Sequence, residues 1–167
     1  MEFARKSVLY WYIAIRGAKP ISTPSCRKLM RKMIQAVRDM DKNKIGHRDL
    51  KIENIMFSDE YEIKLIDFGH SQPSKDEDGN YLLYSCPKKN PGFGTAEYRT
   101  PELVAGEQFT LVEYDLYSLG VILFMMQTKI RPYDEINDKN HKLFVKNNEK
   151  YWDNIRKEVK KKGIQIN

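Results

Sequence analysis

The sequence predicts a mainly α-helical domain with one small β-ribbon. Three observations lead to this fold class. Apolar residues recur at three- and four-residue steps between residues 26 and 40, residues 112–128 are strongly apolar, and residues 55–66 alternate around a short polar turn. The chain has 167 residues, of which 41% are hydrophobic, so it can bury one core of ordinary size. We therefore expect one domain.

The first third of the chain should contain two helices. Residues 7–16 are expected to form a short helix. A longer one should begin with Thr23 as its N-cap and Pro24 at its first helical position, where the missing N–H costs nothing. This helix should end between residues 41 and 44.

The middle of the chain predicts a hairpin, a long loop and a buried helix. Residues 55–57 and 61–66 form the expected hairpin. Residues 67–102 show little periodicity and many turn formers, and a loop of this length is usually functional or mobile. The apolar run 116–126 inside the buried helix is shorter than the roughly 18 residues that a membrane span needs. We therefore expect no membrane insertion.

The net charge of +6 comes from the last part of the chain. Residues 139–167 hold nine Lys or Arg and three Asp or Glu, whereas the charges of residues 1–138 balance. Apolar residues interrupt the basic run at roughly helical spacing. The pattern predicts the solvated face of an amphipathic helix, and we expect no nucleic-acid binding.

The cysteines and the N-terminus indicate the compartment. Cys26 and Cys86 lie far apart with no metal-ligand spacing, which favours two buried free thiols in a reducing environment. The apolar residues 8–15 lack the small-residue cleavage site of a signal peptide. We expect an intracellular protein, in the cytoplasm or the nucleus.

The segment HRDLKIENIMF, residues 47–57, is the most polar cluster that needs a function. An unpaired buried charge is too costly for such a loop to be purely structural. Asp49 and Asp67 flank the predicted hairpin, which turns the chain back, so their carboxylates can converge near Asn54. Such hard oxygen ligands are those that Mg²⁺ prefers, and Lys51 beside them would suit phosphoryl transfer.

Three motifs in order carry a resemblance to a known family. HRDLKIEN, IDFG and GTAEYRTPE resemble the catalytic loop, the magnesium loop and the end of the activation segment of eukaryotic protein kinases. The resemblance implies a catalytic loop at 47–54, a magnesium loop at 67–69, an activation segment at 67–102 and a central buried helix at 112–128. It also implies ATP and Mg²⁺ as cofactors and a protein substrate.

The family's catalytic roles carry over to four residues. Asp49 would accept or orient the proton of the substrate hydroxyl, and Lys51 would steady the transferring phosphoryl group as in serine/threonine kinases. Asn54 and Asp67 would hold Mg²⁺. The resemblance therefore implies a serine/threonine protein kinase.

A second set of residues matches positions that support the site in the family. Arg48 resembles the arginine that receives a phosphorylated residue of the activation segment. Thr95 would hydrogen-bond Asp49 and Lys51, and Asp115 would anchor the backbone of the catalytic loop. The set consists of Arg48, Phe68, Gly69, Thr95, Glu102 and Asp115.

The histidines are expected to play no catalytic part, and two arginines do not match a family position. His47 resembles a member of the family's stacked hydrophobic spine, so we expect a structural role. His70 and His141 should be surface residues. Neither Arg131 nor Arg156 is in place to match the arginine that pairs with the family's Pro-Glu glutamate.

The start of the sequence resembles the kinase hinge. Residues 1–6 would be this hinge and residues 7–167 most of the large, C-terminal lobe. The backbone of Glu2 and Ala4 would face adenine, and Met56 would form the floor of its pocket. The motifs of the N-terminal lobe are missing from the sequence, so we expect a truncated domain that is inactive alone. Its exposed face would meet the missing lobe or a partner.

Three functions remain open at this point. The intact motifs favour a serine/threonine kinase. The missing N-terminal lobe motivates a non-catalytic, kinase-derived interaction module instead. A nucleic-acid binder that uses the basic tail is the weakest hypothesis, and strong salt dependence of binding would be required for it.

Overall fold

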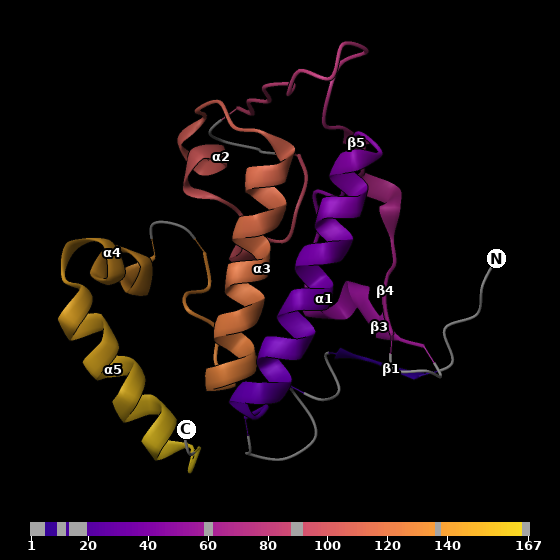
Figure 1. Ribbon diagram of the computed structural model, residues 1–167. Coiled ribbons are helices and arrows are strands. Elements are labelled where there is room, and N and C mark those ends of the chain that lie inside the picture. Colours follow the sequence, from indigo (N-terminus) through magenta and orange to yellow (C-terminus); the bar gives the residue numbers. More distant parts are fainter. Residues whose placement is uncertain are drawn as a thin grey trace.

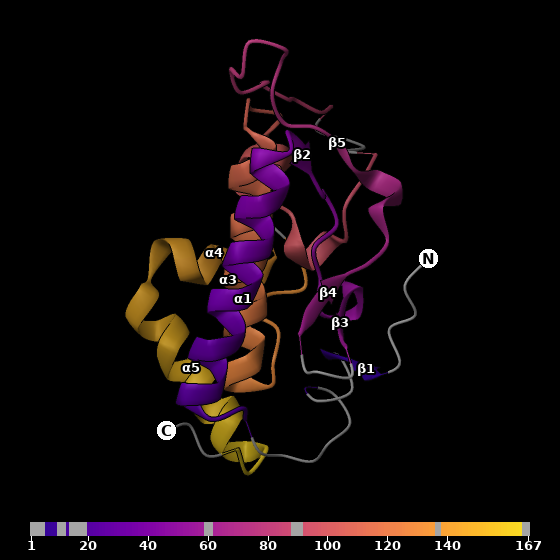
Figure 2. The same ribbon diagram turned by 45° about the vertical axis from the view of Figure 1, so that its right-hand side comes forward.

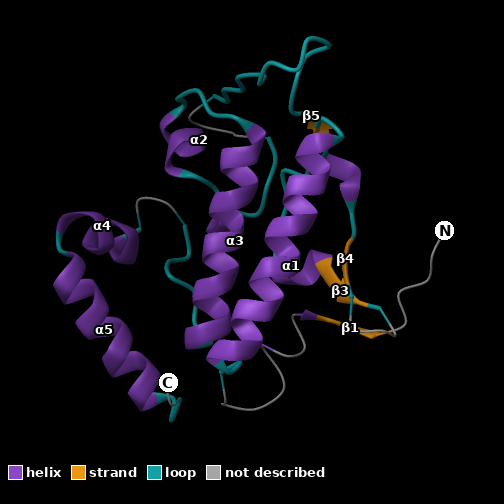
Figure 3. Ribbon diagram, viewed as in Figure 1, coloured by secondary structure: helices purple, strands orange, loops and turns teal. Residues whose placement is uncertain are grey.

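Two long helices lie side by side at the centre of the molecule (Figure 1). The computed structural model describes residues 6–9, 13, 20–58, 62–87, 92–135 and 138–164. The central pair consists of α1 (Thr23–Lys42) and α3 (Leu111–Thr128). A small sheet lies on one side of this pair and two further helices lie on the other (Figure 3). The mainly helical fold agrees with the prediction, but the described part contains two small sheets where one β-ribbon was predicted.

Helix α1 forms where the apolar stripe predicts it and ends at Lys42, within the expected interval. Its predicted N-cap is wrong by one position. Ser22 is the cap, because its hydroxyl oxygen accepts a hydrogen bond from the Ser25 backbone N–H at 3.4 Å. Thr23 is therefore the first helical residue, and Pro24 still lies in the first turn, where its missing N–H is harmless. The buried stripe consists of Cys26, Met33, Val37 and Met40.

Helix α3 confirms the predicted buried helix and begins one residue earlier than expected. A capping box starts it: Thr110 accepts from the Glu113 backbone N–H, and the Glu113 carboxylate accepts from the Thr110 N–H at 2.9 Å. Ten of its eighteen residues are buried, so α3 forms the core of the domain.

A three-stranded antiparallel sheet contains the predicted hairpin. Its strands are β1 (Lys6–Val8), β3 (Ile55–Phe57) and β4 (Ile63–Leu65), in that order. The β3–β4 pairing confirms the hairpin. The helix predicted over residues 7–16 is wrong at its start, because residues 6–8 pair with β3 as a strand. A short apolar run does not distinguish the two structures by periodicity, and most of residues 10–16 lie outside the described part.

The long loop after the hairpin is ordered by short pairings rather than by long elements. Strand β5 (Gln72–Pro73) pairs with β2 (Ile45–Gly46), and two isolated bridges follow at Lys75–Tyr81 and Tyr84–Phe109. The segment passes over one end of both central helices (Figures 1 and 2). Its remaining elements, with the turn before β3, are η2 (Ile52–Asn54), η3 (Phe68–His70), η4 (Ala96–Tyr98) and α2 (Pro101–Ala105).

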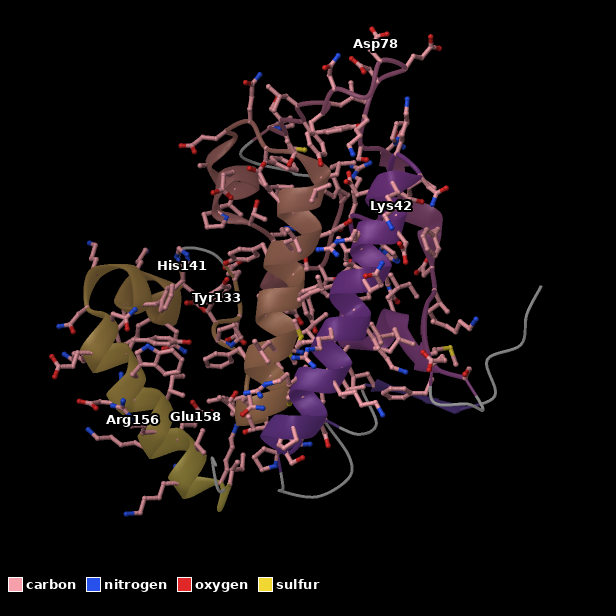
Figure 4. The ribbon with its side chains drawn as sticks, viewed as in Figure 1. Lys42, Asp78, Tyr133, His141, Arg156 and Glu158 are labelled. Carbon is pink, nitrogen blue, oxygen red and sulfur yellow. The ribbon has the colours of Figure 1, made fainter. Side chains whose placement is uncertain are left out.

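Helices α4 (Lys139–Lys146) and α5 (Asn148–Lys161) contain the basic part of the chain. The amphipathic prediction is confirmed for α5, whose buried side chains are Tyr151, Ile155 and Val159. The prediction that His141 is a surface residue is wrong. Its side chain is 8% exposed, because α4 turns it edge-on to the Tyr133 ring at 5.1 Å (Figure 4). This burial lowers the pKa of His141.

Two smaller expectations concern the thiols and the membrane. Both cysteines are free, as predicted, but only Cys26 is buried, whereas Cys86 is half-buried. Among the described helices, none is long and apolar enough to cross a membrane.

Candidate active site

One side chain of the central helix α3 binds the loop at residues 47–54. Asp115, which is 1% exposed, accepts hydrogen bonds from the backbone N–H groups of His47 at 2.8 Å and Arg48 at 3.0 Å. Burial raises the pKa of Asp115 to about 7, against these two N–H groups, which lower it. The predicted contact between Asp115 and the loop backbone is confirmed.

His47 fixes the loop to the end of the hairpin. Its ring is fully buried and lies 4.8 Å from the Phe68 ring, centroid to centroid. The Asp49 backbone N–H donates to Nδ1 at 3.4 Å, which leaves Nε2 to donate to the Ile66 carbonyl at 3.0 Å. Burial lowers the pKa of His47, although the nearby carboxylates of Asp49 and Asp67 oppose this. A neutral His47 that links two backbones fits the predicted structural role.

Both carboxylate oxygens of Asp49 have partners. The side chain is 5% exposed, and its Oδ1 accepts from the Thr95 backbone N–H at 3.1 Å and the Thr95 hydroxyl at 2.8 Å. The Lys51 ammonium lies 2.7 Å from Oδ2 and also donates to the Thr95 hydroxyl at 3.1 Å. Thr95 therefore contacts Asp49 and Lys51 as predicted. These contacts fix where the carboxylate points.

Asn54 and Asp67 lie together at the end of the hairpin. The Asn54 carbonyl accepts from the Ile66 backbone N–H at 3.0 Å, and Asp67 is the next residue. The Asn54 side-chain nitrogen donates to the Asp49 carbonyl at 2.9 Å. Asp67 has a left-handed backbone with a φ of 62°, and its exposed carboxylate accepts from the Gly69 N–H at 3.4 Å.

The donor chemistry of this pair fits Mg²⁺. Because the amide nitrogen of Asn54 is bound to Asp49, its amide oxygen is left as a hard ligand, and the Asp67 carboxylate supplies another. The described residues contain no cluster of three or more His, Cys, Asp or Glu that could hold a metal. Mg²⁺ commonly binds through one or two protein ligands and completes its shell with water and substrate phosphates.

The predicted adenine contacts are only partly covered by the structure. Met56 is half-buried in β3. Glu2 and Ala4 lie outside the described residues, so their part in adenine binding stays a prediction. Phe68, which directly follows Asp67 at the end of the hairpin, is 45% exposed.

The acidic residues near α2 show one contact that the sequence did not predict. Within the described ranges, Glu102 forms no ion pair. Arg131 instead pairs with Glu97 at 3.3 Å, and Arg156 pairs with Asp153 on its own helix. Neither arginine meets Glu102, as expected. Long-range pairs of this kind carry no signal in local spacing.

The side chain of Arg48 lies against two aromatic rings that sequence reasoning also missed. Its guanidinium carbon is 3.7 Å from the centroid of the Phe93 ring and 6.0 Å from that of Tyr84. Its Nε is buried without a hydrogen-bond partner among the described residues. The predicted role of Arg48 in binding a phosphorylated residue stays a prediction.

Comparison with known proteins identifies the class. The family model for the protein kinase domain matches residues 1–164, so the chain belongs to the protein kinase family. The carbon catabolite-derepressing protein kinase of Candida tropicalis is 37% identical over 135 residues, which is 81% of this chain and 20% of that protein. Serine/threonine protein kinase OSK3 of Oryza sativa subsp. indica is 33% identical over 146 residues, 87% of this chain and 26% of its own length.

A human relative shows a similar level of likeness. NUAK family SNF1-like kinase 2 of Homo sapiens is 35% identical over 146 residues, 87% of this chain and 21% of that protein. The chain thus spans about a fifth to a quarter of the length of these relatives. All three relatives are named as kinases, and OSK3 is named as a serine/threonine protein kinase.

Proposed function

We propose that this chain carries the catalytic loop and the magnesium loop of a serine/threonine protein kinase. The reaction transfers the terminal phosphoryl group of ATP to a serine or threonine hydroxyl of a protein substrate. The observation that carries the proposal is the arrangement around Asp49, whose carboxylate is held by Thr95 and Lys51 within 3.1 Å. A buried carboxylate with fixed direction beside a lysine is what positioning a hydroxyl for phosphoryl transfer requires.

The residues of the chain would divide the work as follows. Asp49 accepts or orients the hydroxyl proton at its carboxylate, a general-base contribution of about 10²–10⁴-fold. Lys51 supplies a positive charge next to this carboxylate, where charge on the transferring group develops. Asn54 and Asp67 would hold Mg²⁺, which when bound neutralises charge on the phosphates.

The nucleotide would bind at the sheet side of the domain. In this proposal residues 1–6 are the hinge, the backbone of Glu2 and Ala4 meets adenine, and Met56 lies beneath it. The described part then corresponds to the large lobe of the kinase domain. In this proposal a small lobe or a partner protein would cover this face, where the Phe68 ring is 45% exposed.

The test is a phosphoryl-transfer assay on the protein that carries this chain, with ATP, Mg²⁺ and peptide libraries that offer Ser, Thr or Tyr. We expect phosphate on Ser and Thr peptides. Asp49→Asn should lower kcat by about 10²–10⁴-fold with nucleotide affinity retained. Asp67→Asn should weaken Mg²⁺-dependent ATP binding, measured by calorimetry.

Asp78→Asn is the matched control, because Asp78 is an exposed carboxylate at the outer tip of the 76–80 turn (Figure 4). It should behave as the wild type. Transfer at the wild-type rate by folded Asp49→Asn would overturn the proposal. So would a folded protein that binds no Mg·ATP, which would favour a non-catalytic interaction module.

A further inference from the structure

Arg48 and two aromatic rings of the activation segment form what we call the aromatic clamp: Arg48, Tyr84 and Phe93. The guanidinium carbon lies 3.7 Å from the Phe93 centroid and 6.0 Å from the Tyr84 centroid. A cation over an aromatic face is attracted by the ring quadrupole, and more strongly when the pair is desolvated. Phe93 is 7% exposed, so its contact with Arg48 is shielded from water.

The rings of the clamp rest on a common base. Phe93 packs on Tyr114 of α3 at 5.5 Å and on Phe109 at 6.5 Å between centroids. Tyr84 exchanges two backbone hydrogen bonds with Phe109, at 2.9 and 3.0 Å. Tyr84 and Phe93 therefore contact Arg48 while both are bound to Phe109.

A short rigid path joins Phe93 to the reacting carboxylate. Thr95, two residues further on, donates both its N–H and its hydroxyl to Asp49. The backbone of this stretch is held as well, because the carbonyls of Phe93 and Gly94 accept hydrogen bonds from the Arg99 side chain at 3.3 and 2.9 Å. A shift of the Phe93 ring would thus move the donors that aim Asp49.

We propose that Phe93 is a positioning residue for the phosphoryl-transfer site. By stacking on Arg48 it fixes residues 93–95 against the catalytic loop and so holds Thr95 on the Asp49 carboxylate. The clamp consists of unmodified side chains, and it acts without a phosphate on the segment. This inference rests on the proposed kinase function for its kinetic consequence, although the geometric part stands without it.

The competing interpretation is that Phe93 only fills the core. Phe93→Leu keeps an apolar side chain but removes the aromatic face, whereas Phe93→Tyr keeps the face. Phe109→Leu is the matched control, since Phe109 belongs to the same aromatic cluster and Phe93 and Tyr84 are the rings in contact with Arg48 in the described structure. A core-filling role makes the two leucine variants equivalent, and the clamp makes them differ.

The first measurement is hydrogen–deuterium exchange of the Thr95 amide in the phosphatase-treated protein, without nucleotide. The clamp predicts that Phe93→Leu speeds this exchange by about tenfold or more relative to Phe109→Leu, at matched global stability. Phe93→Tyr should retain protection. On an Arg48→Met background, Phe93→Leu should add little, because the contact is already lost.

The second measurement is kinetic. Phe93→Leu should lower kcat by about 10- to 100-fold with KM for ATP unchanged, since a small misplacement near the reacting group costs about this much. Phe93→Tyr should rescue it. Equal exchange in Phe93→Leu and Phe109→Leu, or protection of Thr95 only after phosphorylation, would overturn the clamp while leaving the kinase function intact. Absence of transfer with the predicted exchange pattern would overturn the function and leave the clamp.

Discussion

Gly94 offers a sharp test of how the segment packs against α3. Its φ is 72°, and a Cβ built there would lie 2.1 Å from the Tyr114 hydroxyl oxygen and 3.2 Å from its Cζ. A side chain in the left-handed region costs about 1–2 kcal/mol. Overpacking of a tight site adds about 1–3 kcal/mol. Gly94→Ala should therefore lower the free energy of unfolding by about 2–5 kcal/mol.

A second substitution separates the two costs. The Tyr114 hydroxyl is buried without a hydrogen-bond partner in the described structure, so Tyr114→Phe should be neutral or stabilise by about 1 kcal/mol. In the double variant the atom that collides with the new methyl group is gone, while the backbone strain remains. The two substitutions should thus couple favourably by about 1–3 kcal/mol.

The assay is urea denaturation of the wild type, both single variants and the double variant, followed by circular dichroism at constant pH. Equal m-values across the four proteins would show that the comparison measures stability alone. Effects that add within about 0.5 kcal/mol would refute the predicted collision. A Tyr114→Phe variant that loses more than about 1 kcal/mol would show that the hydroxyl has a partner.

Three further predictions concern the central helix and α5. The folded pKa of Asp115, about 7, lies above its unfolded value, so its contribution to stability is complete below the unfolded pKa and is lost as pH rises through 7. Relative to Asp115→Asn, the wild type should lose stability between pH 4.5 and 7.5, by at most about 1.4 kcal/mol per unit; a pH-independent difference in denaturation would contradict this. Thr110→Ala should cost about 1 kcal/mol in thermal unfolding, because it removes the acceptor for the Glu113 N–H, and a loss under about 0.3 kcal/mol would disprove the cap. In α5, Ile155→Ala should cost about 2–5 kcal/mol and exposed Arg156→Ala less than about 1, and similar values in denaturation would show that the helix is not packed as described.

The sequence predicted well those elements whose structure depends on the pattern of their own residues. The apolar stripe of α1 and the continuous apolar residues of α3 indicate which residues are buried. Strand β1 does not, because its partner β3 lies about fifty residues further on and an apolar run fits either structure. The same limit explains His141, whose burial depends on where Tyr133 lies.

Site contacts across long sequence separations had a different origin. Thr95 and Asp49 are 46 residues apart, and Asp115 and His47 are 68 apart. No periodicity in the sequence predicts either contact. Both predictions came from the resemblance to the protein kinase family. The stacking of Phe93 on Arg48 has no such precedent in the motifs, so only the structure reveals it.

Asp115 holds the loop at residues 47–54 through backbone groups rather than through side chains. The carboxylate binds backbone N–H groups, which every residue except proline possesses. This attachment to α3 therefore does not depend on which side chains positions 47 and 48 carry, although the His47 ring adds its own contact with Ile66. A substitution at Arg48 would leave both hydrogen bonds to Asp115 in place, whereas the loss of the Asp115 carboxylate would release the backbone of two successive residues at once.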